Sequence, residues 1–243
     1  MVSVVIPAYN EGEKIGRAID TVKRFLHSRD IPHELIIVDD GSRDDTRVQA
    51  QRAAERWKGI SIQSLPSNRG KGAAVRRGVL SATGDPVCFL DADLSTPIET
   101  LPAALDAIAA GADVVIGSRH VAGARIEAAQ PAVRQQLGRY YTWLANRFTG
   151  ANVADFTCGF KVFTRDAADA LFRQQRLTRW SFDAELLFLA RRNGFSVSEL
   201  PVVWTNDRRT KVHLIGDVFR SFAELLLLRW YSVRGRYTRH GKR

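Results

Sequence analysis

The first half of the chain alternates short apolar runs with longer stretches in which apolar residues recur at helical spacing. The apolar runs, most of them rich in Val and Ile, lie at residues 2–6, 34–39, 60–64, 86–91 and 113–118. The helical stretches between them lie near residues 11–29, 44–58, 71–82 and 97–110. This alternation predicts an α/β fold with a mostly parallel sheet that is covered by helices on both faces. Ligands of such sheets bind at the carboxyl ends of the strands, so the residues that follow each strand are the first candidates for chemistry.

The second half of the chain has a different pattern. Amphipathic helices are predicted at residues 131–150, 180–193 and 214–233. A loop is predicted over residues 155–161, and Gly194 supplies the stop signal for the second helix. Residues 196–204 have the composition of a strand, in which Pro201 indicates a position at the edge of a sheet. We therefore expect one continuous domain whose second half completes a site begun by the first.

The composition is that of a globular protein. The chain has 243 residues, of which 45% are hydrophobic and 26% are charged, and this excludes a disordered chain. Its two cysteines, Cys88 and Cys158, exclude a disulfide framework, and no Cys or His spacing suggests zinc. No charge-free run exceeds ten residues, so we expect no membrane-spanning helix of about 20 apolar residues. The N-terminus lacks a basic region and a cleavage site, and we expect a first strand there rather than a signal peptide.

The net charge of +10 is concentrated near the C-terminus. Residues 207–243 hold ten Lys or Arg and three Asp or Glu. A basic segment of this kind favours an anionic partner, which is a lipid surface, a nucleic acid or a phosphorylated substrate. Nucleic-acid binding is disfavoured, because no basic motif is interleaved with aromatic residues and the strand ends are acidic.

Two clusters of polar residues follow the first two predicted strands. In the first, Tyr9 is able to stack on a base and Glu11 is able to accept hydrogen bonds from ribose hydroxyls. An ordinary turn with Asn10 as the helix N-cap explains the same residues. In the second, one of the adjacent carboxylates Asp39 and Asp40 is able to accept from a base while the other caps the next helix. Taken alone, each cluster is better explained as a strand-to-helix turn.

Two further clusters carry stronger signals. Gly70 and Gly72 flank Lys71 at the start of a helical stretch, where backbone N–H groups and an ammonium group favour a phosphate. The spacing is not that of a Walker A loop. Asp91 and Asp93 end the fourth predicted strand, and two carboxylates so close together repel each other unless a cation lies between them. Hard oxygen ligands suit Mg²⁺ or Mn²⁺, so we predict a metal site there.

These motifs occur in an order that resembles a known family. The segments VVIPAYNE, IIVDDGSRDDT, NRGKGAAVRRG and FLDADLSTP resemble family 2 glycosyltransferases with the GT-A fold. The later segments GSRH, DFTCGFKVF, FDAELLFLARRNGF and ELPVVW with RTKV resemble the group that transfers sugars to polyprenyl or dolichyl phosphate. The resemblance spans residues 1 to about 215. It implies a GT-A catalytic domain at 1–212, with a nucleotide-sugar half at 1–120 and an acceptor half at 121–212, followed by an amphipathic helix and basic tail at 213–243.

The resemblance implies roles for residues on the donor side. The nucleotide sugar is expected to contact Pro7, Tyr9, Glu11, Asp40, Lys71, Asp91, Ala92, Asp93 and Lys211. Asp91 and Asp93 are expected to hold Mg²⁺ or Mn²⁺ against the donor diphosphate, where the metal neutralises the leaving group. Ser95 stands where mannosyl-transferring members often have Gln, and the spacing from Trp204 to Lys211 is closer to the glucosyl-transferring members.

The resemblance also implies acceptor-binding and catalytic residues. The expected acceptor-binding residues are Arg119, Arg125 and Lys161, and the expected catalytic residues are Asp93, Arg119, Asp183 and Glu185. A phosphate acceptor is largely anionic at neutral pH, so it needs no strong general base, and Asp183 is expected to position a substrate. A solvated helix face is the alternative for Asp183 and Glu185.

The expected function is metal-dependent, inverting transfer of a sugar to polyprenyl or dolichyl phosphate, with glucose from UDP-glucose as the favoured donor and a β-linked product. One alternative is a GDP-mannose-dependent transferase with the same acceptor. Two others from a different class are a non-catalytic protein that binds nucleotide sugars and a nucleic-acid-binding protein. The sequence predicts no oligomeric state.

A polyprenyl phosphate lies in a bilayer, so this chain is expected to reach a membrane surface. The helix at 214–233 and the residues after it combine apolar and basic side chains. Those that suit an interface are Arg220, Arg229, Trp230, Tyr231 and Tyr237. The helix at 131–150 is a second candidate, and the alternative for 214–233 is that it packs on the domain. We expect a peripheral protein on the cytoplasmic face of the membrane.

Overall fold

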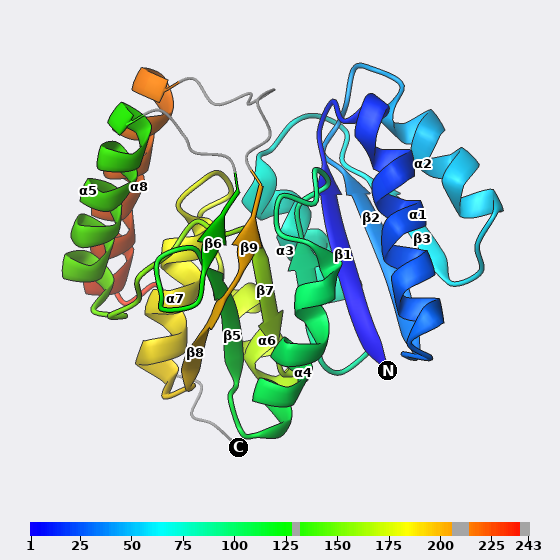
Figure 1. The fold of residues 1–243 in the computed structure, drawn as a ribbon. Coiled ribbons are helices and arrows are strands. Elements are labelled where there is room, and N and C mark those ends of the chain that lie inside the picture. Colours follow the sequence, from blue (N-terminus) through cyan, green and yellow to red (C-terminus); the bar gives the residue numbers. More distant parts are fainter. Residues whose placement is uncertain (128–131, 206–213, 239–243) are drawn as a thin grey trace.

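The computed structural model describes residues 1–127, 132–205 and 214–238. Its strands are β1 (Val2–Ala8), β2 (His33–Asp39), β3 (Ile60–Ser64), β4 (Val87–Leu90), β5 (Val114–Ser118), β6 (Arg125–Ile126), β7 (Phe160–Phe163), β8 (Val197–Pro201) and β9 (Val203–Trp204). Its helices are α1 (Gly12–Ser28), α2 (Thr46–Glu55), α3 (Lys71–Ser81), the short η1 (Ile98–Thr100), α4 (Leu101–Ala109), α5 (Ala132–Thr149), α6 (Arg165–Gln174), α7 (Phe182–Asn193) and α8 (Leu214–Val233). Helices lie on both faces of the central sheet (Figure 1).

The central sheet has seven strands within the described residues, in the order β3-β2-β1-β4-β7-β5-β8. Neighbouring strands are parallel except at β7, which runs antiparallel to both β4 and β5. β1 pairs with β2 along its whole length, from Val2 opposite His33 to Ala8 opposite Asp39. The predicted α/β fold with a mostly parallel sheet is thus confirmed. The carboxyl ends of β1 and β2 lie at the upper edge of the sheet in Figure 1, and β4, which is parallel to β1, ends at the same edge.

Two apolar layers cover the sheet, and alternate residues of the central strands enter one or the other. Val5 of β1 packs in the layer formed with α3, α6 and α7, whereas Val4 and Ile6 pack in the layer formed with α1, α2 and α4. Every residue of β1, β4 and β5 is buried. Burial of each large aliphatic side chain contributes about 1.5–3 kcal/mol to stability. Because both faces of these strands are covered, polar side chains reach solvent mainly where the strands end.

Neither β7 nor α6 is predicted by the sequence pattern. β7 begins at Phe160, inside the predicted loop, and all four of its residues are buried. A four-residue strand that contains a buried lysine has none of the alternation that marks a half-buried strand. Its antiparallel insertion between β4 and β5 also departs from the strand–helix–strand order on which the prediction rests.

The predicted strand at residues 196–204 is divided between two sheets. β8 ends at Pro201 and lies at the edge of the seven-stranded sheet, as the proline indicates. β9 pairs with β6 in a separate two-stranded ladder, where Arg125 lies opposite Val203. Between β8 and β9, Val202 donates its N–H to the Ser118 carbonyl at 3.2 Å, which fixes the change of direction.

The last helix packs on the domain through one face and exposes the other. Leu225 and Leu228 of α8 are buried in the same apolar layer as α7, whereas Leu226 is 62% exposed and Trp230 is 46% exposed. The expectation that Tyr237 faces a membrane is wrong, because this side chain is 3% exposed and its hydroxyl donates to a buried carboxylate. Among the residues that the structure describes, we find no helix with the length and apolar content that a bilayer crossing requires.

A partly buried Lys–His contact at the opposite end of β2 predicts a contribution to stability that is lost in acid. The Lys23 ammonium lies 2.7 Å from Nε2 of His33 and donates to the Lys58 carbonyl at 2.8 Å, so the ring must be neutral to accept. Burial, assisted by the Lys23 charge, lowers the pKa of His33 below its ordinary value of 6.5. The unfolded chain therefore binds more protons than the folded chain, and stability is lost as pH falls below 6.5.

Between pH 7.5 and pH 5.5 we expect the free energy of unfolding in urea to fall more in wild type than in His33→Gln, which cannot titrate at this position. An equal fall in wild type and variant would show that other groups carry the acid sensitivity.

Candidate active site

A lysine and an aspartate from two elements meet where the sheet ends. Asp91 follows β4, and Lys71 is the first residue of α3. The Nζ of Lys71 lies 2.6 Å from Oδ1 of Asp91. Burial acts to lower the pKa of Lys71, but the charges of Asp91 and Asp183 outweigh it and raise that pKa. Lys71 therefore carries a fixed positive charge among carboxylates at the strand ends.

A second ion pair lies fully buried beside the first. Nζ of Lys161 on β7 is 2.6 Å from Oδ1 of Asp183 in the first turn of α7. The same ammonium donates to the carbonyls of Phe156 at 3.0 Å and Cys158 at 2.8 Å. Burial raises the pKa of Asp183, and the charges of Lys161 and Lys71 oppose that rise. Lys161 is 0% exposed, so its contact in this structure is with Asp183 and not with solvent.

Asp91 and Asp93, the predicted metal ligands, lie directly after β4. The side chain of Asp91 is about one third exposed, Ala92 is buried, and Asp93 reaches solvent while it accepts from the Ser95 N–H at 2.9 Å. A methyl group at Gly159 would lie 1.9 Å from Oδ2 of Asp91, so the carboxylate occupies space that only glycine leaves open. Partial desolvation and the Asp91 charge raise the pKa of Asp93.

A divalent cation fits this pair of carboxylates. Within the described ranges, no group of three or more His, Cys, Asp or Glu side chains is arranged to hold a metal ion. Asp91 and Asp93 offer two carboxylates. Proteins usually supply one or two carboxylate ligands to a Mg²⁺ ion that also binds substrate phosphates. A cation there would also relieve the repulsion that raises the pKa of Asp93.

Asp40 organises the loop that leads into α3. Its carboxylate, 2% exposed, accepts from the N–H groups of Arg69 and Gly70 at 2.8 Å each and from the Asn68 amide at 2.9 Å. Burial raises the pKa of Asp40, and these hydrogen bonds oppose that rise. Gly70 adopts φ +102°, and a Cβ there would lie 2.5 Å from the Thr178 carbonyl. Asp40 therefore sets the position of Lys71, the residue after Gly70.

The remaining predicted nucleoside contacts lie at the end of β1. Pro7 is buried within the strand, and Tyr9 and Glu11 are half-buried just beyond it. Glu11 donates its N–H to Thr46 at 2.7 Å, and its carboxylate lies 3.4 Å from Lys14. These contacts join the end of β1 to the start of α2. Lys211, the last predicted donor-side residue, lies outside the described residues.

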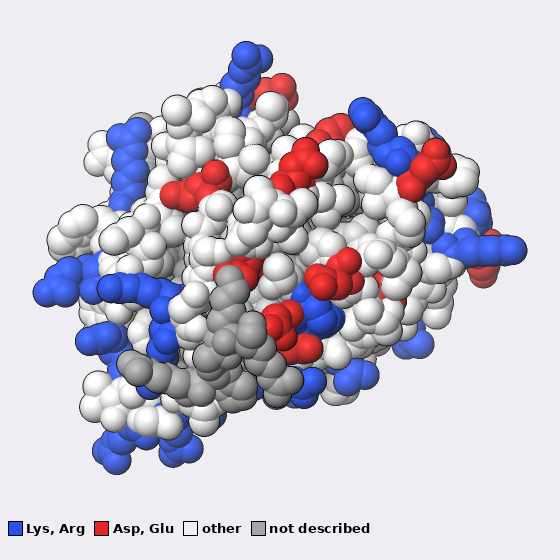
Figure 2. Space-filling view, turned by 90° about the horizontal axis from the view of Figure 1, so that it is seen from below, with Lys and Arg blue, Asp and Glu red and all other residues white. Residues whose placement is uncertain are grey.

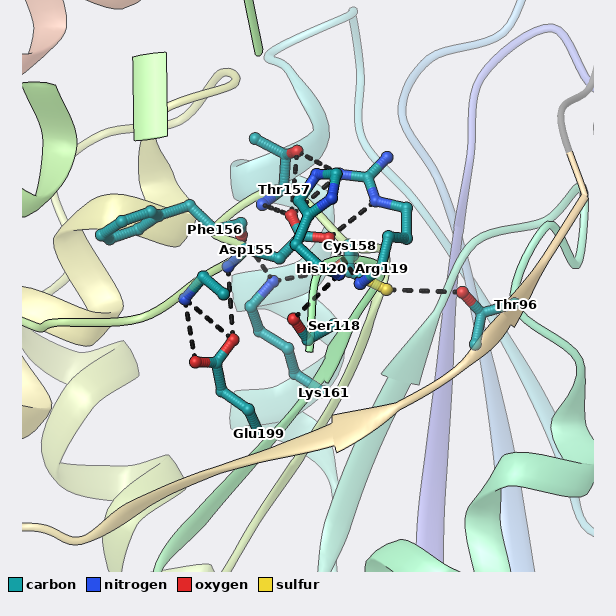
Figure 3. A network of polar contacts seen from close by, with 11 residues as sticks. Thr96, Ser118, Arg119, His120, Asp155, Phe156, Thr157, Cys158, Lys161 and Glu199 are labelled. Carbon is teal, nitrogen blue, oxygen red and sulfur yellow. Dashed lines mark hydrogen bonds and ion pairs between the residues drawn. The ribbon is translucent and has the colours of Figure 1, made fainter. Parts of the chain in front are cut away.

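Arg119 belongs to a network that joins the end of β5 to the segment before β7 (Figure 3). Its Nε and Nη2 donate to the two oxygens of Asp155 at 2.7 and 2.8 Å, and Nη2 also donates to Thr157 at 2.7 Å. The guanidinium lies over the Trp204 ring, 5.3 Å from its centroid. Burial would raise the pKa of Asp155, but Arg119 lowers it. Arg125, the other predicted acceptor arginine, is exposed on β6.

Glu185 is buried, and its carboxylate accepts several hydrogen bonds from within the protein. It is 0% exposed, and its carboxylate accepts from the N–H groups of Arg176 at 3.0 Å and Leu177 at 2.8 Å. The Tyr237 hydroxyl donates to it at 2.6 Å. Burial raises the pKa of Glu185, which these donors oppose. The helix-face alternative for Asp183 and Glu185 fails, because both side chains are buried.

A groove that the sequence does not predict lies beside the Arg119 network. It has a volume of about 490 Å³ and is lined by His120, Arg139, Thr142, Trp143, Asn146, Val153 and Ala154. His120 and Arg139 are exposed, and Trp143 is 60% exposed. Two of its lining residues are joined by hydrogen bonds, because the Asn146 side chain of α5 donates to the Val153 carbonyl at 2.8 Å and accepts from the Val153 N–H at 3.0 Å. No local pattern reveals such a contact, although Arg139 and Trp143 are one helical turn apart.

Comparison with known proteins identifies a family whose model matches this chain and solved structures that share its fold. The model of the family described as glycosyl transferase family 2 matches residues 3–172. Dolichyl-phosphate beta-glucosyltransferase ALG5D of Trichomonas vaginalis is 34% identical over 242 residues, covering 96% of this chain and 74% of the relative. Dolichyl-phosphate beta-glucosyltransferase of Homo sapiens is 30% identical over 246 residues, covering 96% and 76%.

Solved structures share the fold at lower identity. Glucosyl-3-phosphoglycerate synthase of Mycobacterium tuberculosis, in complex with Mn²⁺, UDP and glucosyl-3-phosphoglycerate, superposes with a TM-score of 0.72. The identity is 23%, and the match covers 94% of this chain and 79% of that one. The likeness confirms the predicted GT-A arrangement of strands and helices.

The Lys161–Asp183 pair predicts a large and asymmetric effect on stability. Lys161→Met leaves a buried carboxylate without its cation and two carbonyls without their donor. We expect it to lower the free energy of unfolding by about 3–5 kcal/mol in urea titrations. Lys161→Met combined with Asp183→Asn removes both charges and should recover part of that loss. A single variant within about 1 kcal/mol of wild type would contradict the pairing.

Proposed function

Because the chain belongs to glycosyl transferase family 2 and is a glycosyltransferase, we propose that it transfers glucose from UDP-glucose to the phosphate of a polyprenyl lipid of the dolichyl class. Relatives named dolichyl-phosphate beta-glucosyltransferase, 30–34% identical over most of the chain, support the sugar and the acceptor. A fold neighbour whose complex holds Mn²⁺ and UDP-glucose supports the donor. The observation that carries the proposal is the cluster of Lys71, Asp91 and Asp183 at the strand ends.

The donor diphosphate fits this cluster by charge. Asp91 and Asp93 would hold Mg²⁺ or Mn²⁺, which when bound supplies Lewis-acid neutralisation of the leaving diphosphate. Lys71 adds a positive charge, because the charges of Asp91 and Asp183 raise its pKa and keep the amino group protonated. A preorganised cation of this kind stabilises negative charge as it develops on the leaving group. Asp40 contributes indirectly, since it holds the loop from which Lys71 projects.

The acceptor needs orientation more than activation. A phosphate monoester has a second pKa of about 6 and is largely anionic at neutral pH. Asp183, fixed by Lys161 and close to Lys71, is suited to hold the sugar by accepting from a hydroxyl group. Attack by the acceptor oxygen on the side of the anomeric carbon opposite the diphosphate inverts that carbon. An α-linked donor then gives the β-linked product.

We place the acceptor in the groove beside α5, and the chemistry of its lining supports this choice. Arg119 is held by Asp155, and Lys161 is held by Asp183, so both of these predicted cations already have partners. His120 and Arg139 place further positive or donor groups at the groove, and Trp143 and Val153 provide apolar contacts. A phosphate joined to an isoprenoid chain requires that combination of cationic and apolar surface.

The exposed faces of α5 and α8 support docking on a lipid surface. Large apolar side chains that are exposed there are Val133, Tyr140 and Trp143 on α5, and Leu226, Leu227, Trp230 and Val233 on α8. The two helices pack against each other through Tyr140 and Phe222, whose ring centroids are 5.8 Å apart. The left-hand rim in Figure 2, on the side where Figure 1 shows α5 and α8, carries several Lys and Arg side chains. Such a surface matches the anionic cytoplasmic leaflet of a membrane.

The reaction is tested directly with purified protein, a short polyprenyl phosphate, Mg²⁺ or Mn²⁺ and labelled UDP-glucose. We expect label in the organic phase from UDP-glucose, and a fall of about 100-fold or more in Asp93→Asn, which weakens charge neutralisation at the diphosphate. Glu99→Gln removes an exposed carboxylate six residues away and serves as the control. Labelling from GDP-mannose alone would overturn the donor, and no labelling from any donor would overturn the acceptor.

Docking is tested by sedimentation with vesicles that contain anionic lipid. Leu226→Glu together with Val233→Glu places two negative charges on the exposed face of α8. We expect this variant to lose most vesicle binding, whereas Val48→Glu, an equivalent change at an exposed position on α2, should bind like wild type. Equal binding by all three proteins would rule out the α8 face as the contact surface.

A further inference from the structure

The start of α7, which carries Asp183, lacks a local cap. Ser181 is the N-cap residue, and its side chain makes no capping hydrogen bond to the helix. In a capping box, a Glu or Gln three residues after the N-cap accepts from the N–H of the N-cap residue. The corresponding residue here is Ala184, which has no acceptor side chain. The N–H of Ser181 must therefore find its acceptor elsewhere.

Glu224 of α8 supplies that acceptor. Its Oε2 accepts from the Ser181 N–H at 3.0 Å, across 43 residues of sequence. The Ser181 hydroxyl donates to the Ser221 carbonyl, one turn earlier on α8, at 3.2 Å. Burial raises the pKa of Tyr141 of α5, and the charges of Asp183 and Glu224 add to that rise, as expected for a hydroxyl group near both carboxylates.

The chain that follows α8 holds the other side of the same helical turn. Tyr237 donates to Glu185 at 2.6 Å, and Arg176 donates to the Arg236 carbonyl at 2.9 Å. The Arg176 guanidinium also lies over the rings of Tyr231 and Tyr237, at 5.7 and 6.0 Å. Asp183 is thus flanked in sequence by Ser181 and Glu185, and both of these residues are held by the C-terminal part of the chain.

We propose that Glu224 and Tyr237 are positioning residues for Asp183, so that α8 completes the catalytic site as well as facing the lipid surface. The proposal rests on the proposed function, in which Asp183 contacts the sugar. α7 begins with four buried residues, two of them acidic, and the direction of its first turn sets where the Asp183 carboxylate lies. A misplacement of about 1 Å at such a group is sufficient to cost up to 100-fold in turnover.

The test compares kcat and KM for UDP-glucose in the full-length protein, with the lipid acceptor dispersed in detergent so that vesicle binding is not needed. We expect Glu224→Ala to lower kcat by roughly tenfold to 100-fold while KM for UDP-glucose changes less than about twofold. Glu224→Gln keeps a carbonyl oxygen for the Ser181 N–H and should restore most of the turnover. Glu55→Ala makes the same chemical change at an exposed position of α2 and should behave as wild type.

Tyr237→Phe removes only the hydroxyl that donates to Glu185, and we expect it to lower kcat in the same manner. Amide hydrogen exchange supplies a reading that does not depend on turnover. Exchange in residues 181–185 should accelerate in Glu224→Ala and not in Glu224→Gln, while the strands of the sheet stay protected.

Each outcome bears on one proposal. No turnover by wild type with any donor would remove the proposed function, and faster exchange in Glu224→Ala would then still support the cap from α8. Faster exchange without a change in kcat would overturn the positioning role. Glu224→Gln as impaired as Glu224→Ala, or a fall in activity that merely follows a global loss of protection, would also overturn it.

Discussion

The burial of acidic side chains beneath the strand ends is the constraint on which the rest of this structure depends. A buried carboxylate without a partner costs several kcal/mol, so each must be paired or accept hydrogen bonds. Asp183 has Lys161, Asp91 has Lys71, and Asp155 has Arg119. Asp40 has instead the N–H groups of a loop. These partners come from separated parts of the chain, so satisfying the carboxylates also fixes how the two halves of the domain meet.

The sequence predicts the parts of this arrangement that follow from local pattern. Buried parallel strands are apolar throughout, so β1, β2 and β4 stand out, and the acidic residues at their ends are recognised with them. The strand that delivers Lys161 is different. β7 is four residues long, contains a lysine and inserts antiparallel between β4 and β5. The hydrophobic pattern of the sequence therefore predicts neither this strand nor its position in the sheet. From the sequence alone, Lys161 is therefore interpreted as a cation available to a ligand. In the structure it forms an ion pair with Asp183.

The same distinction explains the C-terminal region. The length and amphipathic character of α8 are local properties, and the predicted bounds of 214–233 agree with the structure. The partners of its side chains are not local properties. Tyr237 lies 52 residues from Glu185 in sequence, and Glu224 lies 43 residues from Ser181. An aromatic residue in a basic tail is typical of a membrane interface, and only the tertiary contact reveals that this one is buried against a carboxylate.

Pairing in the interior also determines where free charge remains. Lys71, Lys161 and Arg119 are basic residues of the candidate active site, and each forms an ion pair with an acidic residue. In and just after α8, by contrast, Arg220, Arg229, Arg234 and Arg236 are exposed. Under the proposed function, exposed basic residues of this kind attract an anionic lipid surface, and no ion pair of the site has to break for them to do so. Attraction to the membrane and alignment of the reacting groups therefore fall, under the proposed function, to different sets of basic residues, and α8 takes part in both.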